Sequence, residues 1–220
     1  MIEQYLKVTR ATLILCARQT LYMVALSLIG GALLGMLLSI ILILTRPKGL
    51  MEKKYLYLFL NTIVNMVRST PFIILLVAIM PFTKFIVGTR IGTTAALIPL
   101  IVNVAPYLSR LFENSMLGVD EGIIEAAQSM GASKKQIIWY FLIPEAKSSL
   151  ILALTTGTIS LLGSTAMAGA IGAGGIGNLA IIYGHERVNT PLMVITVLIL
   201  IIIVHIFQSF GNALARRFRH

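Results

Sequence analysis

Charged residues are scarce in this sequence of 220 residues, because Asp, Glu, Lys and Arg together make up only 12% of it. A soluble globular domain has roughly 25% charged residues. Half that share cannot cover a water-facing surface. The composition therefore excludes an ordinary soluble enzyme and predicts that lipid covers much of the molecule.

Cysteine and histidine are also rare. Cys16 is the only cysteine, which excludes an intrachain disulfide and a cysteine metal cluster. The three histidines, His185, His205 and His220, are too scattered along the chain to indicate a zinc site. The sequence therefore predicts no metal site.

Acidic residues are few, eight against 18 Lys and Arg, which gives a net charge of +10. The basic residues lie in short clusters between long apolar runs, as in the loops of a membrane protein. A nucleic-acid-binding protein would gather them on one face or along one helix. We therefore expect a lipid bilayer, and not nucleic acid, as the partner of this charge.

Nucleotide-binding motifs are missing. No Gly-x-x-x-x-Gly-Lys-Ser/Thr occurs, and no lysine follows a glycine. Gly172, Gly174 and Gly177 match the dinucleotide fingerprint as a string, but they end a predicted membrane span and no βαβ unit surrounds them. Packing of small residues is the ordinary interpretation, and a pliant outer gate is the functional alternative.

Five long apolar runs are what the sequence has in abundance. Each approaches the 20 or so residues that a helix needs to cross a bilayer. They predict an all-α integral membrane protein with spans at about 21–44, 57–80, 91–109, 149–171 and 190–212. These spans form one domain, 21–214, between an amphipathic lead-in at 1–20 and a basic tail at 215–220.

The basic residues also predict the orientation. With the N-terminus outside, eleven Lys and Arg residues lie on the cytoplasmic side and six outside, with Arg68 left in a span. The positive-inside rule then predicts a cytoplasmic C-terminus. The long polar segment 110–147 faces the cytoplasm in this topology.

Polar residues in the second predicted span share one helical face. Asn61, Asn65 and Arg68 are spaced by four and three. We expect this face to point into the protein, because lipid does not accept it. Pro71 is expected to break or kink the same helix.

Segment 110–147 predicts two short amphipathic helices. The first covers 121–130 and ends at Gly131, a residue that commonly follows a helix terminus. Ser133 is expected to cap the second, which carries Ile137, Ile138 and Phe141 and stops at Pro144. Two such helices present apolar side chains to a partner, or lie on the lipid surface.

The residues of this segment resemble the EAA loop of type I ABC importer permeases. The family pattern is Glu-Ala-Ala, three residues, Gly, nine residues, then Ile-x-Leu-Pro. This sequence departs from it only by apolar exchanges, with Phe for Ile and Ile for Leu. The resemblance implies a coupling helix that docks on an ATPase subunit. The residues that match the family's coupling positions are Glu125, Ala126, Ala127, Gly131, Phe141 and Pro144.

A wider resemblance runs from about residue 20 to the end. The segments 45–47, 68–76 and 166–177 look like the permease of the bacterial methionine importer. That family imports methionine, in some members also the D-enantiomer, across the cell inner membrane. The resemblance implies two permeases, two ATPases and an extracytoplasmic methionine-binding lipoprotein. The permease itself then has no cofactor, because the ATPase binds ATP and Mg.

Alternating access in a homodimer is the mechanism that we expect, because five spans alone make too thin a wall for a pathway. An importer of another amino acid remains an alternative. An ion-driven carrier is disfavoured because no span holds a clear carboxylate, and a membrane-embedded enzyme or scaffold because no cluster of His, Asp or Glu lies at membrane depth. The candidate pathway and gate residues are Asn61, Asn65, Arg68, Ser69, Asn103, Ser160, Ser164, Gly172, Gly174, Gly175, Gly177 and Asn178.

Overall fold

The computed structural model describes residues 9–47 and 49–218, which form helices joined by short connections. No strand occurs among them, which confirms the all-α prediction. A helix satisfies its backbone hydrogen bonds internally, as a lipid-embedded chain requires. In chain order the elements are α2 (Arg10–Thr45), α3 (Lys54–Ser69), α4 (Phe72–Val87), α5 (Thr93–Leu117), α6 (Glu121–Ser129), α7 (Lys134–Gln136), the π-helical turn η1 (Ile137–Leu142), α8 (Ile143–Glu145), α9 (Lys147–Ala168), η2 (Gly169–Ala173), α10 (Gly175–Asn178), η3 (Leu179–Glu186) and α11 (Thr190–Arg217).

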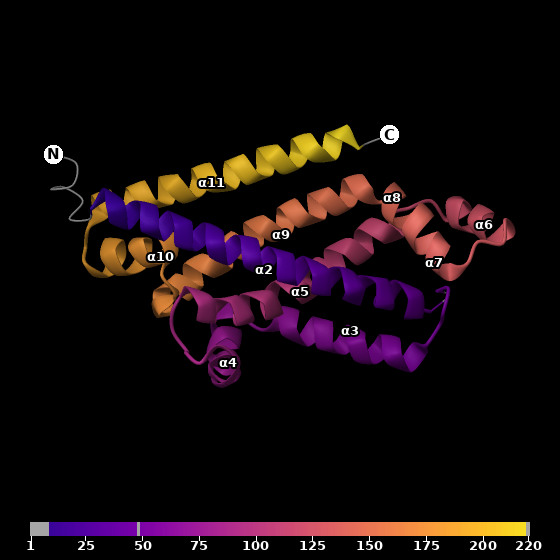
Figure 1. The fold of residues 1–220 in the computed structure, drawn as a ribbon, viewed down its shortest axis with the longest axis horizontal. Coiled ribbons are helices and arrows are strands. Elements are labelled where there is room, and N and C mark those ends of the chain that lie inside the picture. Colours follow the sequence, from indigo (N-terminus) through magenta and orange to yellow (C-terminus); the bar gives the residue numbers. More distant parts are fainter. Residues whose placement is uncertain (1–8, 48, 219–220) are drawn as a thin grey trace.

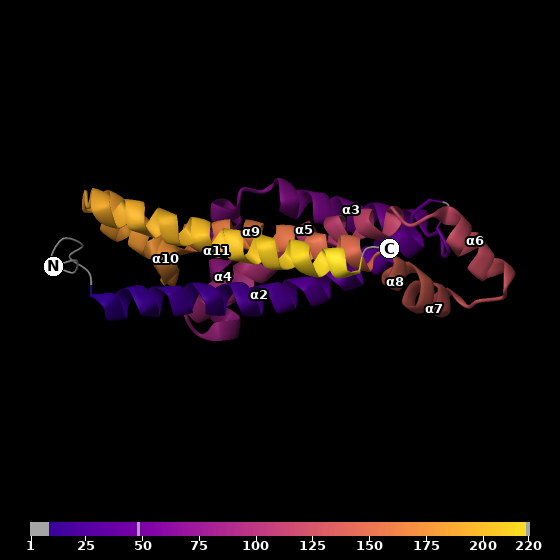
Figure 2. The same cartoon turned by 90° about the horizontal axis from the view of Figure 1, so that it is seen from above.

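Helices α2, α5, α9 and α11 form the long bundle of Figure 1, with α3 beside it. Among the described residues, four helical segments are long and apolar enough to cross a membrane, and a fifth is added if the bent pair α3–α4 counts as one span. In Figure 1 and Figure 2, α6 and α7 extend beyond one end of the bundle, whereas α10 lies near the other end.

The α2–α5 contact is the most extensive helix packing in the bundle. Gly31 lies directly against the side chain of Val104. A Cβ atom on Gly35 would lie 2.9 Å from the carbonyl oxygen of Ala105 and 3.0 Å from the Cβ of Leu108. Glycines at this spacing let two membrane helices approach with their backbones nearly touching.

The break predicted at Pro71 is present and is much sharper than a kink. Helix α3 ends at Ser69 and α4 begins at Phe72, with an angle of 111° between them. Pro71 has no N–H to donate to α3, and it holds Thr70 in an extended conformation. The helical segments differ from the predicted span 57–80, because α4 continues through Pro81 to Val87. Lys84, expected in a turn, lies in the last turn of that helix.

Two other predicted boundaries also differ from the structure. Helix α2 runs unbroken from Arg10, so residues 10–20 of the expected lead-in continue the first span. Neither Gly nor Pro occurs there to end the helix. Helix α5 continues to Leu117, so the first eight residues of the expected loop 110–147 are helical. The rest of the lead-in (1–8), Lys48 and the last tail residues (219–220) lie outside the described residues.

Replacing Gly35 by Val is expected to destabilise the fold by roughly 1–3 kcal/mol, because the added carbons overpack the contact with α5. The measurement is the melting temperature of the purified protein in detergent. Gly163→Ala is the matched control, since no atom lies within 4 Å of its added Cβ. Equal melting temperatures for the two variants would contradict this account of the α2–α5 contact.

Candidate coupling surface and translocation pathway

Two capped helices form the end of the molecule that projects from the bundle. The side chain of Asp120 accepts a hydrogen bond from the backbone N–H of Gly122 at 2.8 Å, which caps α6. Gly131 turns the chain with a φ of +77°, a conformation that favours glycine. Ser133 and Gln136 then form a reciprocal capping box at the start of α7. The predicted roles of Gly131 and Ser133 are confirmed.

The faces of α6 and η1 differ from the expected ones. Glu125 and Ala126 are exposed, but Ala127 is fully buried and α6 packs against η1. Ile137 and Ile138, expected to face a partner, are buried in the protein. Their positions on the surface are taken by other residues. The exposed apolar side chains are Met130 at 71%, Trp139 at 62% and Tyr140 at 72% exposure.

Trp139 and Tyr140 are therefore functional candidates that the sequence pattern missed. The periodicity of the second short helix pointed to its isoleucines. A π-helical turn, however, rotates the following side chains relative to an α-helix. Trp and Tyr are enriched at the centres of protein interfaces, and this preference is the signal that could have identified them.

The prediction that Pro144 stops this helix is wrong. The helical run continues through η1 and α8 to Glu145, and Pro144 lies in the first turn of α8. The N–H of Ile143 donates to the carbonyl of Ile138, five residues back. This wider turn shifts the hydrogen-bond register just before the proline, which lacks an N–H.

A polar cluster joins α3 to α5. The guanidinium of Arg110 donates to Glu113 Oε2 at 2.6 Å, to Asn65 Oδ1 at 3.2 Å and to Asn61 Oδ1. Glu113 is only 3% exposed, so its charge is compensated chiefly by Arg110. The structure thus brings the two predicted asparagines into contact with α5.

Arg68 does not share that environment. Although it is on the same helix as the asparagines, Arg68 is exposed, and so is Ser69. Within the described part of the chain neither side chain has a hydrogen-bond or ion-pair partner. The expectation that the whole face points into the protein is wrong for Arg68 in this single chain. The reason is that α3 ends one residue later, at the sharp bend before α4.

Helices α5 and α9 share a second polar contact. Asn103 Nδ2 donates to Ser164 Oγ at 3.1 Å, and Ser164 Oγ donates to the carbonyl oxygen of Ser160 at 3.3 Å. The side chain of Ser160 itself is exposed. Gly163 and Met167 are exposed at helical spacing from it, so one side of α9 has no cover in the single chain.

The glycine-rich segment forms a tight turn at the other end of the bundle. Gly172, Gly174 and Gly175 have φ values of +87°, +80° and +82°. Gly177 packs against the backbone of Ala166. The close approach of Gly177 to Ala166 is the packing of small residues that the sequence suggests. Movement of this turn as an outer gate stays a prediction. Asn178, next to this turn, has a buried side-chain oxygen without a hydrogen-bond partner in the described residues.

Two residues of α2, which sequence reasoning did not single out, hold this turn. Gln19 Oε1 accepts a hydrogen bond from the N–H of Gly175 at 2.9 Å. Thr20 Oγ1 accepts one from the N–H of Ile176, also at 2.9 Å. The two acceptors satisfy the free N–H groups at the start of α10 from another helix. No local pattern predicts this contact, because it spans 156 positions in the chain.

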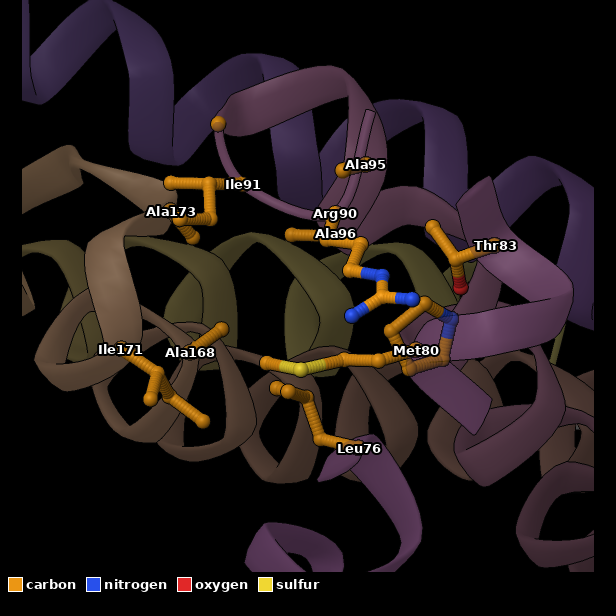
Figure 3. Close-up of a pocket in the computed structure, with 12 residues that line it drawn as sticks. Leu76, Met80, Thr83, Arg90, Ile91, Ala95, Ala96, Ala168, Ile171 and Ala173 are labelled. Atoms are coloured by element: carbon orange, nitrogen blue, oxygen red, sulfur yellow. The ribbon is translucent and has the colours of Figure 1, made fainter. Parts of the chain in front are cut away.

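A small pocket lies where α4, the start of α5 and η2 meet (Figure 3). The side chain of Arg90 extends across it toward Met80 and Thr83 in that view. The hydroxyl of Thr83 is buried and has no hydrogen-bond partner among the described residues. The volume of about 20 Å³ suits a single water, so this pocket is too small for an amino acid.

Thr20→Val is expected to lower stability by roughly 1–3 kcal/mol, since it leaves the buried N–H of Ile176 without an acceptor. Thr20→Ser keeps the hydroxyl and is the matched control. Melting temperatures of the two purified variants give the comparison. Similar values would mean that this hydrogen bond does not hold the turn.

Arg110→Met is expected to cost roughly 3–5 kcal/mol, because Glu113 is then buried without a cation. The double variant Arg110→Met, Glu113→Leu removes both charges and should regain most of that loss. Thermal unfolding of the wild type and both variants is the measurement. A double variant no more stable than the single one would argue against the ion-pair explanation.

Comparison with known proteins identifies the family that has this architecture. Residues 31–220 match the model of the family described as binding-protein-dependent transport system inner membrane component. The chain is 45% identical over 219 residues to the probable D-methionine transport system permease protein MetI of Vibrio cholerae, covering 100% of this chain and 97% of the relative. It is 44% identical over 172 residues to the methionine import system permease protein MetP of Bacillus subtilis, with 78% of each covered.

A solved structure has the same fold. A chain of the MetNI methionine ABC transporter, solved in inward facing conformations, superposes with a TM-score of 0.94 at 39% identity. The alignment covers 96% of this chain and 98% of that chain. The family match and these relatives cover nearly the whole molecule, including both ends of the bundle and the projecting helices. The chain belongs to the family of binding-protein-dependent transport system inner membrane components.

Proposed function

We propose that the chain is the permease subunit of an ATP-driven ABC importer that carries methionine into the cytoplasm. The observation that carries this proposal is the projecting segment formed by α6, α7 and η1. It has Glu125 of α6 and Trp139 and Tyr140 of η1 on its surface. A charged residue beside large aromatic side chains suits a protein partner. Methionine is supported by the names of the relatives, which transport it or its D-enantiomer.

The surfaces that the single chain leaves uncovered suit three protein partners. Two ATPase subunits bind the projecting helices on the cytoplasmic side and hold ATP and Mg, so the permease breaks no bonds itself. A second copy of this chain completes the pathway, and an extracytoplasmic methionine-binding lipoprotein delivers the substrate. The N-terminus is then outside and the C-terminus in the cytoplasm, as the distribution of basic residues favours.

The pathway runs along the uncovered side of α9 and the polar contacts beside it. Asn103, Ser160 and Ser164 offer hydrogen-bonding groups there. Asn61, Asn65, Arg68, Ser69 and Asn178 are further lining candidates. The glycine turn that contains Gly172, Gly174, Gly175 and Gly177 is the outer gate. Because Gln19 and Thr20 of α2 hydrogen-bond to this turn, the gate moves together with α2.

The test is uptake of labelled methionine into proteoliposomes that contain this chain, its ATPase and its binding protein. Wild-type uptake is expected to require ATP. Glu125→Lys is expected to reduce it at least about tenfold, because the reversed charge opposes docking of the ATPase. Glu186→Lys is the matched control, since Glu186 is exposed at the end of η3, outside the projecting segment.

The possible results separate the parts of the proposal. Transport of another amino acid, but not of methionine, would keep the mechanism and refute the substrate. Uptake that follows an ion gradient and ignores ATP would refute the importer class. Equal losses in the two charge-reversal variants would refute the special role of Glu125.

A further inference from the structure

Arg46 is a charged residue whose surroundings are incomplete. It follows the last residue of α2, and its backbone N–H donates to the carbonyl of Leu42 at 2.9 Å. A cation at this end of a helix is stabilised by the helix dipole. Yet its Nε atom is buried without a hydrogen-bond partner, and no ion pair involves Arg46 within the described residues. A buried guanidinium atom without a partner is costly, which points to a partner acquired in another conformation.

The missing partner is close by. Arg46 lines a cavity of about 430 Å³ between the α2–α3 turn, the end of α5 and helix α6. Glu121 and Glu125 line the same cavity from α6. They are four residues apart and therefore share one face of that helix. The remaining wall is mostly apolar and includes Ile43, Met116 and Leu142. Opposite charges thus line one cavity without touching.

Helix α6 has room to move toward Arg46. A second hollow, of about 440 Å³, continues along the same boundary and shares Gly49, Leu50 and Gln128 with the first. Ala127 is the only buried residue of α6. The helix is therefore held on its η1 side and is separated from the α2–α3 turn. The superposed relative was solved in inward facing conformations, so this open cavity accompanies an inward-facing shape.

We propose that Arg46 is a positioning residue of the coupling helix and forms an ion pair with Glu121 when α6 moves into this cavity in the ATP-bound transporter. The inference rests on the proposed function, because it takes the ATPase as the source of the movement. The pair transmits that movement to α2. Helix α2 is continuous from Arg10 to Thr45, and near its other end Gln19 and Thr20 hold the glycine turn. Arg46 therefore links the coupling helix mechanically to the opposite end of the protein.

Cysteine cross-linking in the complex with the ATPase tests the movement. Pro47→Cys and Gln128→Cys place thiols on opposite walls of the cavity and leave Arg46 and Glu121 intact. Cys16→Ser removes the only native cysteine. Disulfide trapping is expected to be roughly 5- to 10-fold faster with a non-hydrolysable ATP analogue than without nucleotide. The control pair, Pro47→Cys with Ser129→Cys, should show no such change, because Ser129 does not line the cavity.

Adding Arg46→Gln to the 47–128 cysteine pair tests the charge. Trapping with the ATP analogue is expected to fall to the rate without nucleotide, whereas Arg46→Lys should retain most of the increase. The same substitutions, made without the cysteines, give a functional readout. Arg46→Gln should lower methionine transported per ATP hydrolysed roughly 5- to 10-fold without reducing the amount of assembled complex.

Two results would overturn the inference. One is trapping that does not depend on nucleotide in a parent protein that transports methionine. The other is an Arg46→Gln variant with unchanged trapping and coupling. ATP-driven uptake by the Cys16→Ser parent is measured on the same preparation. A parent that traps with ATP analogue but moves a different amino acid refutes the substrate and supports the role of Arg46.

Discussion

The near contact of α2 with α5 is the packing on which the rest of the molecule depends. Glycine at positions 31 and 35 brings the two backbones together, and Val104, Ala105 and Leu108 fill the space that side chains would otherwise occupy. Because neither helix can shift without losing this fit, α2 behaves as a rigid rod along the bundle. Its two ends then place functional elements. One end holds the glycine turn through Gln19 and Thr20, and the other presents Arg46 in the cavity lined by α6.

Irregular backbone is confined to places where other groups satisfy it. At Pro71 the chain leaves α3 at a sharp angle, where the N–H of Thr70 donates to the carbonyl of Val67 and the carbonyl of Pro71 accepts from the N–H of Ile74. In the glycine turn, two side chains of a distant helix accept the free N–H groups of α10. Before Pro144 a π-helical turn shifts the hydrogen-bond register. Within lipid, each solution avoids an unpaired backbone group that would cost several kcal/mol.

Two sets of polar side chains inside the bundle join helices. Arg110 joins α5 to α3 through two asparagines while compensating Glu113, and Asn103 joins α5 to α9 through Ser164. Both contacts involve α5, the most buried of the spans. The central helix thus combines tight packing against α2 with polar contacts on its other sides. Helix α11, by contrast, is mostly uncovered in the single chain, as a surface facing lipid or a second subunit would be.

The sequence by itself determined the helical class, the number of apolar segments, the break at Pro71, and the helix end at Gly131 and the cap at Ser133 in the short helices. Those features depend on neighbours in the chain, so composition, spacing and proline chemistry predict them. The EAA pattern likewise marked the coupling loop through residues within twenty positions of one another. Only the tertiary structure decided which face each helix buries. Ala127 turned inward because α6 packs against η1. Trp139 and Tyr140 turned outward because a π-helical turn changes the register. Gln19 and Thr20 hydrogen-bond to the glycine turn, and Arg46 lines one cavity with Glu125. These residues are far apart in the chain, so local sequence patterns carry no information about their contacts.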